Sequence, residues 1–116
     1  MVDAWIDEIK KNFNPDEVGM ILAHNGIVRG TSKEGLPVKG MFLSYDKRLL
    51  ETKIGEFKKR EGIVEIKAWI NEGELRVGDD IMYLLVAGRF RTDVLPVLQE
   101  LLTTVKKEIV HEREVG

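Results

Sequence analysis

The chain contains no cysteine among its 116 residues. This absence excludes disulfide bonds, thiolate metal sites and a cysteine nucleophile, and it fits a reducing compartment such as the cytoplasm. Long apolar segments are also missing, because the longest run, Ile81–Ala87, is far shorter than the ~20 residues that a membrane-spanning helix needs. The N-terminus has neither the basic region nor the apolar core of a signal peptide. We therefore expect a cytoplasmic protein with no membrane partner.

Neither sign of charge predominates. The 18 Lys and Arg residues against 20 Asp and Glu residues give a formal net charge of −2 and a pI near 5.7. Duplex nucleic acid requires a concentrated basic face, and single strands require aromatic residues among the basic ones. Neither pattern is present, so we expect no nucleic-acid partner. The acidic pair Asp79-Asp80 lacks a third ligand at a useful spacing and indicates a turn rather than a metal site.

The composition is that of a globular chain, with 43% hydrophobic and 33% charged residues. The length predicts one domain over 1–116, and no linker, repeat or low-complexity tract divides it.

Hydrophobic periodicity and turn residues predict the order helix, strand, strand, helix, strand, strand, helix. This order is typical of an α+β sandwich in which helices pack on a mixed, mainly antiparallel sheet. We expect the loop over 30–37 to be exposed and mobile, and the composition of 112–116 is compatible with disorder. The expected elements are a helix capped by Asp3 and ended by Asn14-Pro15, strands over 18–28 (with a bend at 24–26) and 38–45, a helix capped by Asp46 and running to about Arg60, a strand over 63–70, a glycine-bounded hairpin over 73–80 leading into a strand buried on both faces over 81–87, and a helix from about Thr92 to at least Ile109.

The junction before the last helix carries Arg89 and Arg91. A helix start with arginines beside it favours an anion, because its free N–H groups and the helix dipole both attract negative charge. For Arg91 the alternative is an ion pair with Asp93, and Arg89 is expected to be structural or solvated. Arg29, at the end of the first strand, is a further candidate for anion binding, with a surface or interface salt bridge as its alternative.

The last helix carries a candidate catalytic lysine. On a helical wheel that starts at Val94, Lys106 falls at the edge of the apolar arc, whereas Lys107 faces away. A cation at that edge can rest its stem on apolar surface and direct its charge into a cleft, and Arg113 would stack beside Lys106 if the helix continued. The alternative for Lys106 is a solvated residue near a helix C-terminus. His24, in an apolar strand, is expected to be packed and hydrogen-bonded rather than a base.

Several motifs taken together resemble those of the large, catalytic subunit of molybdopterin synthase, and the resemblance extends from about Val18 to Arg113. The motifs are Gly26-x-Val28-Arg29, Gly73-Glu74-Leu75-x-x-Gly78-Asp79, the apolar strand, Arg91 and Lys106. The resemblance implies an α/β-hammerhead type of fold and a homodimer. Each large subunit would receive the C-terminal Gly-Gly tail of a small ubiquitin-like sulfur carrier, in a heterotetramer.

What the resemblance implies about activity is equally specific. The tail of the small subunit carries a thiocarboxylate, and two sulfur transfers convert a cyclic pyranopterin phosphate into the dithiolene of molybdopterin, in the biosynthesis of the molybdenum cofactor. These steps need no metal and no cofactor. Carried over residue by residue, the resemblance implies that Lys106 is catalytic and that Arg29, Arg91 and Arg113 bind the substrate.

The chain departs from the family pattern at several positions. Arg113 stands where a second lysine is expected, and an arginine does not deprotonate in proteins. Phe90 replaces a histidine, and Ile70-Asn71 replaces a histidine-arginine pair. The two lost histidines are the side chains best suited to proton transfer near neutral pH.

Two functions are therefore open at this point. The first is a molybdopterin-synthase-like sulfurtransferase, which the retained Arg29, Arg91 and Lys106 favour. The second is a catalytically degenerate relative that keeps the fold and the dimer but only binds an anionic ligand or a protein tail, which the departures favour.

Overall fold

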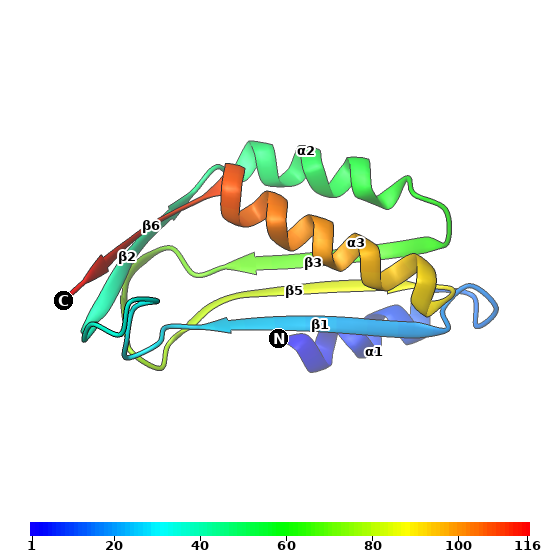
Figure 1. The fold of residues 1–116 in the computed structure, drawn as a ribbon. Helices are drawn as coiled ribbons and strands as arrows, with labels where there is room; N and C mark the ends of the chain where they lie inside the picture. Colours follow the sequence, from blue (N-terminus) through cyan, green and yellow to red (C-terminus); the bar gives the residue numbers. More distant parts are fainter.

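A computed structural model describes all 116 residues and confirms the α+β class (Figure 1). No helix in it is both long enough and apolar enough to cross a membrane. The elements in chain order are α1 (Val2–Asn12), β1 (Met20–Ile27), β2 (Gly40–Tyr45), α2 (Lys47–Lys58), β3 (Ile63–Ile70), β4 (Gly73–Arg76), β5 (Asp80–Gly88), α3 (Arg91–Thr104), the π-helical turn η1 (Val105–Ile109) and β6 (Val110–Val115).

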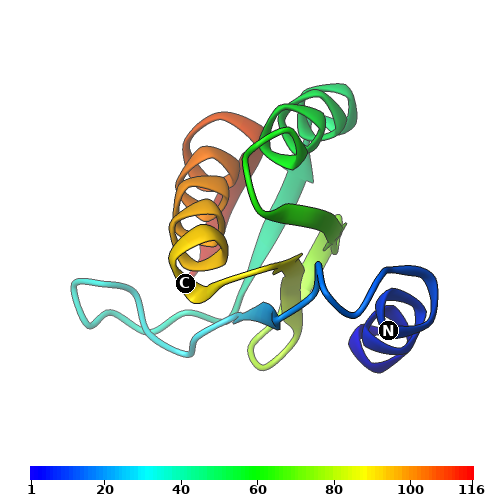
Figure 2. The ribbon, with the colours of Figure 1, turned by 90° about the vertical axis from the view of Figure 1, so that its right-hand side faces the viewer.

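The strands form two three-stranded antiparallel sheets rather than a single mixed one. The first sheet has the order β1-β5-β3 and the second has the order β4-β2-β6. Helices α2 and α3 cover one face of the first sheet, and α1 covers part of the other (Figures 1 and 2). The second sheet extends from the end of the molecule at which α3 ends.

The glycine-bounded turn after β4 is present, but β4 and β5 are not a hairpin. Gly78 has a φ of 92°, and the Asp79 N–H donates to the Arg76 carbonyl, so the chain reverses there. Strand β4 then pairs with β2, whereas β5 pairs with β1 and β3. The prediction of a hairpin was wrong because turn residues specify a reversal and leave the partner of each strand undecided.

Strand β5 is central and buried on both faces, as predicted. Leu84 and Val86 have no exposed surface and belong to a core cluster of 19 residues. Leu85 and Ala87 are equally buried but point to the opposite face, where they meet Ile9 of α1 in a smaller cluster. A continuous apolar run is the expected pattern for a strand covered on two sides.

The start of α2 confirms the predicted cap. The Asp46 carboxylate accepts the Leu49 N–H at 3.0 Å, which satisfies one of the free N–H groups of the first turn. Asp3 does not cap α1, because that helix begins at Val2, two residues earlier than predicted, and its N-cap Met1 makes no side-chain bond. The carboxylate of Asp3 instead lies within the first turn, where the helix dipole favours negative charge.

The C-terminal segment differs most from expectation. The helix continues to Ile109, as predicted, but its last turn is π-helical: the Val110 N–H donates to the Val105 carbonyl. The chain then forms β6, which pairs with β2 along its whole length, so 112–115 lie in a strand. Arg113 therefore lies on a strand and does not stack beside Lys106 on a helix.

Candidate functional site

The candidate site lies where β1 and α3 end. Met20, the first residue of β1, pairs with Gly88, just before α3 begins, and both elements then run toward the second sheet (Figure 1). Lys106, just after α3, and Arg29, just after β1, therefore belong to the same end of the molecule.

Lys106 lies in the π-helical turn, exposed and in no salt bridge. Val105 and Ile109, in the same turn, have no exposed surface and anchor it to the core. Side chains on a helix lean toward its N-terminus, which directs Lys106 back along β1. The charge of Lys106 accordingly contributes to lowering the pKa of His24 on that strand. Lys107, in the same turn, is not among the charges that act on His24. The role of Lys106 stays a prediction.

His24 follows Met20 and Leu22 on the face of β1 that α3 covers. Burial, followed by the charge of Lys106, lowers the pKa of His24. The neighbouring polar contacts are made by Asn25, whose amide donates to the Gly26 carbonyl and to the Asp80 carboxylate, each at 3.1 Å. No hydrogen bond within the chain involves the imidazole, so the prediction of a hydrogen-bonded histidine was wrong.

The backbone next to Arg29 is fixed by hydrogen bonds between two sequence motifs. The preceding Val28 is 2% exposed; its N–H donates to the Asp79 carbonyl and its carbonyl accepts the Gly78 N–H, both at 2.9 Å. The Gly-x-Val-Arg motif is thus joined to the turn between β4 and β5. The guanidinium donates to the Thr31 hydroxyl at 3.3 Å and makes no salt bridge.

Arg91 lies at the opposite end of the molecule. It is the first residue of α3, and at about 1.5 Å per residue the helix separates it from Lys106 by about 22 Å. Its side chain is exposed and unpaired. The ion pair that was the alternative for Arg91 is made by Arg89, whose guanidinium lies 3.3 Å from Asp93 and 3.5 Å from Glu61. Arg89 is therefore structural, as expected.

Arg113 lies on the outer face of the second sheet, opposite Phe42 in the β2–β6 register. Its guanidinium lies over the Phe42 ring, 4.7 Å from the centroid. A shallow cavity of about 320 Å³ beside this pair also contacts Glu74 and His111. Substrate binding by Arg113 stays a prediction.

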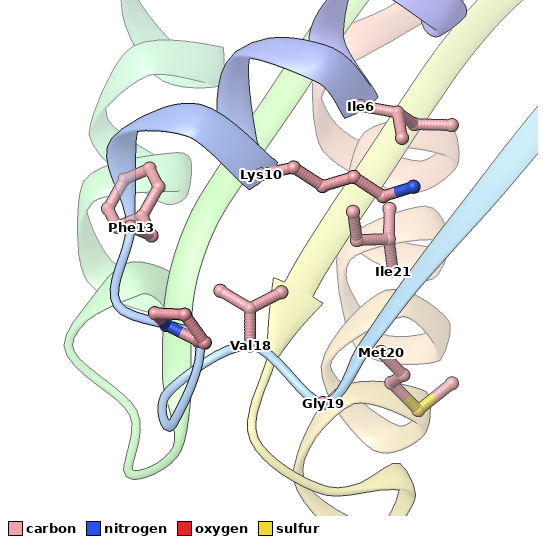
Figure 3. A pocket seen from close by; sticks show the side chains of 8 residues that line it. Ile6, Lys10, Phe13, Val18, Gly19, Met20 and Ile21 are labelled. Atoms are coloured by element: carbon pink, nitrogen blue, oxygen red, sulfur yellow. The ribbon is translucent and has the colours of Figure 1, made fainter.

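The largest cavity, about 470 Å³, lies between α1 and the start of β1 (Figure 3). It is mainly apolar, and Lys10 is its one charged residue. It lies at the end of β1 remote from Arg29 and contains none of the predicted site residues. Its lining consists of Ile6, Lys10, Phe13, Pro15, Val18, Gly19, Met20 and Ile21.

With this geometry established, comparison with known proteins identifies the family. A family model described as MoaE protein matches residues 2–108, nearly the whole chain, and this protein belongs to that family. The matched range includes Arg29, Arg91 and Lys106 and ends before Arg113.

A relative in Methanocaldococcus jannaschii, the uncharacterized protein MJ0717, is 30% identical over an alignment of 110 residues that covers 91% of this chain and 88% of the relative. Among solved structures, molybdopterin synthase from Staphylococcus aureus has a TM-score of 0.74 at 16% identity, covering 95% of this chain and 82% of that one. The molybdopterin biosynthesis MoaE protein from Burkholderia ambifaria has a TM-score of 0.77 at 21% identity, covering 99% and 82%. These likenesses confirm the fold that the sequence motifs implied.

A complex of subunits 1 and 2 of molybdopterin-converting factor from Helicobacter pylori contains a similar chain. Its TM-score is 0.75 at 18% identity, with coverage of 97% of this chain and 74% of that one.

Proposed function

We propose that this protein is the large subunit of a molybdopterin synthase and transfers sulfur from a small-subunit thiocarboxylate to a cyclic pyranopterin phosphate, in the biosynthesis of the molybdenum cofactor. Membership of the MoaE family supports this role. The observation that carries the proposal is the unpaired ammonium of Lys106, which lies at the same end of the molecule as the unpaired guanidinium of Arg29. Unpaired cations on a rigid scaffold suit an anionic substrate.

The chemistry needs fixed positive charge. Displacing oxygen by sulfur on the pterin side chain develops negative charge, and the substrate also carries a phosphate. Lys106 would stabilise the anionic intermediates, and Arg29 and Arg113 would hold phosphate or carboxylate oxygens. Because both partners of each such contact are charged, these bonds are stronger than neutral ones.

A second copy of the chain is part of the proposal. Since Arg91 lies about 22 Å from Lys106 along α3, it can join a substrate site at Lys106 only if a partner copy presents the start of its own α3 there. The proposed assembly is a homodimer of this chain with a small ubiquitin-like subunit on each copy. The Helicobacter pylori complex, which joins two different subunits, supports such a partner.

The test is reconstitution with a thiocarboxylated Gly-Gly partner and the pyranopterin precursor, with dithiolene formation as the readout. Lys106→Ala should abolish product, whereas Lys107→Ala, which changes the neighbouring exposed lysine in the same turn, should retain it. Turnover that is unchanged in Lys106→Ala would remove Lys106 from the mechanism.

A second candidate function is binding of an anionic ligand or a protein tail without turnover. The environments of Ile70 and Phe90, two residues that depart from the family pattern, favour this second function. Ile70 is 5% exposed and belongs to the core, and Phe90 packs under the guanidinium of Arg89 at 4.7 Å. Neither position supplies a proton-transfer group. Calorimetric binding of the thiocarboxylated partner without dithiolene product would favour this second function over the first.

A further inference from the structure

We propose that His24 is the catalytic base of the Lys106 site and that it activates the water that releases the small-subunit tail after each sulfur transfer. This inference rests on the proposed function, and it supplies that function with a proton acceptor from a position outside the motifs of the resemblance.

The first argument is position. Strand β1 and helix α3 run side by side toward the same end of the molecule, and the apolar contacts of β1 with the core end with Met20 and Leu22. His24 is the next residue on that face. Beyond it, Gly26 has no side chain, and a Cβ there would lie 3.5 Å from His24 Nε2. Gly26 therefore places no side chain over the imidazole on the side toward Arg29, where Ile81 and Met82 are the other neighbours.

The second argument is the set of side chains that face the imidazole. On β1 its neighbours on this face are Leu22 and Gly26, and on β5 the residues opposite His24 and Gly26 are Leu84 and Met82, so neither strand contributes a charge. In α3 and the turn that follows it, Lys106 is the charged residue that contributes to lowering the pKa of His24. No carboxylate acts on the ring, so nothing offsets the two effects, burial and the ammonium, that disfavour its protonation.

The third argument is the state of the ring near neutral pH. Because burial and the Lys106 charge both lower the pKa of His24, the imidazole is neutral there and one ring nitrogen has a free lone pair. No hydrogen bond within the chain occupies that lone pair. An ammonium group donates protons and cannot accept one, so Lys106 and His24 supply complementary capacities.

The chemistry of transfer requires such an acceptor. For sulfur to leave the tail, it first displaces an oxygen substituent of the substrate: a C–S bond forms at the substrate carbon, the C–O bond there breaks and the oxygen leaves, while the sulfur is still bonded to the acyl carbon of the tail. Water then attacks that acyl carbon: a C–O bond forms, the C–S bond breaks, sulfur stays on the substrate as a thiolate, and the tail leaves as a carboxylate. The first proton of the water passes to the His24 imidazole as the C–O bond forms, and from there to solvent; the second is released to solvent when the carboxylic acid of the tail ionises. Lys106 stabilises the oxyanion formed at the acyl carbon.

The activity test uses the complex with the thiocarboxylated small subunit. His24→Gln keeps a polar side chain of similar reach, and His24→Phe keeps a ring, but neither can accept a proton. Both should slow tail release in single turnover by about 100-fold or more, the usual effect of losing a general base.

The pH dependence of turnover is a second readout. Wild-type kcat should fall as the pH drops below the pKa of His24, and both variants should lack this acidic limb. Asp3→Asn, on the exposed surface of α1 away from the site, should keep both the rate and the limb. Thermal unfolding verifies that each variant is folded.

A second measurement is independent of turnover. In an NMR titration, the pKa of His24 should lie below the ordinary value, rise in Lys106→Ala, and stay low in Lys106→Arg, which keeps the charge. A pKa that does not move in Lys106→Ala overturns the proximity of the two groups. An active wild type whose His24 variants keep the rate and the acidic limb overturns the role of His24 alone. A wild type that makes no dithiolene overturns the proposed function and the role of His24 with it.

Discussion

The guanidinium of Arg89 lies 3.3 Å from the carboxylate of Asp93 and holds it in the first turn of α3. The start of this helix is therefore already supplied with negative charge from within the chain, at the place where the sequence predicted a site for an external anion. Arg91 is exposed and unpaired next to this ion pair. Two arginines separated by one residue thus have different tasks.

This difference predicts opposite effects for two alanine variants. Arg89→Ala should lower the free energy of unfolding by about 0.5–1 kcal/mol, because it removes partly exposed ion pairs to Asp93 and Glu61. Arg91→Ala should leave that free energy within about 0.5 kcal/mol of wild type and should weaken sulfur transfer. Urea unfolding and the reconstituted assay measure the two quantities. A larger loss of stability in Arg91→Ala than in Arg89→Ala would contradict this assignment.

The cap of α2 predicts a further loss of stability. Asp46→Ala removes the acceptor of the Leu49 N–H and should cost about 1 kcal/mol in urea unfolding. Asp46→Asn keeps an acceptor oxygen and should cost less than Asp46→Ala. Asp3→Ala is a matched control, because Asp3 lies in the first turn of α1 without a capping bond and contributes only about 0.3 kcal/mol through the helix dipole. Equal losses at Asp3 and Asp46 would argue against the cap.

The environment of Glu65 predicts a dependence of stability on pH. Burial raises the pKa of Glu65, but hydrogen bonds from Lys58, 2.6 Å away, and from the Ile66 N–H together outweigh it, so the pKa lies below its ordinary value. A carboxyl group of this kind stabilises the fold above its unfolded pKa of about 4.3, and this contribution is lost as the pH falls through the folded pKa. Glu65→Gln should therefore destabilise the protein more at pH 7 than near pH 3.

Urea unfolding at the two pH values measures this effect. Glu34→Gln, in the exposed loop before β2, is the control and should change stability little at either pH. A loss in Glu65→Gln that is the same at both pH values would show that Glu65 contributes by packing rather than by its charge.

Helix α3 provides a matched pair of leucines. Leu101 has no exposed surface and lies in the main core, so Leu101→Ala should leave a cavity and cost about 2–5 kcal/mol. Leu95 is 39% exposed on the same helix, and Leu95→Ala should stay within about 0.5 kcal/mol of wild type. Chemical unfolding of both variants tests whether the face assigned to the core is correct.

The local features of the fold could be predicted because they depend on residues close together in the chain. The Asp46 cap, the buried strand over 81–87 and the glycine turn at Gly78 each follow from backbone chemistry or from the spacing of apolar residues within a few positions.

Pairing between strands that are distant in sequence decided the features of the fold that could not be predicted. Strand β4 pairs with β2 rather than β5, and the C-terminal segment becomes β6 on the other edge of β2, because partners distant in sequence complete their backbone hydrogen bonds. Arg113 is thereby carried onto a sheet, and Arg91 is kept at the far end of α3.

By itself, the sequence determined the types of element and the lysine at the end of the last helix, since these depend on composition and on local periodicity. The tertiary structure alone decided that His24 lies on the face of β1 that α3 covers, without a hydrogen bond of its own. The physical reason is that the environment of a side chain is set by the strand and helix packed against it, and this packing joins parts of the chain that no local pattern connects.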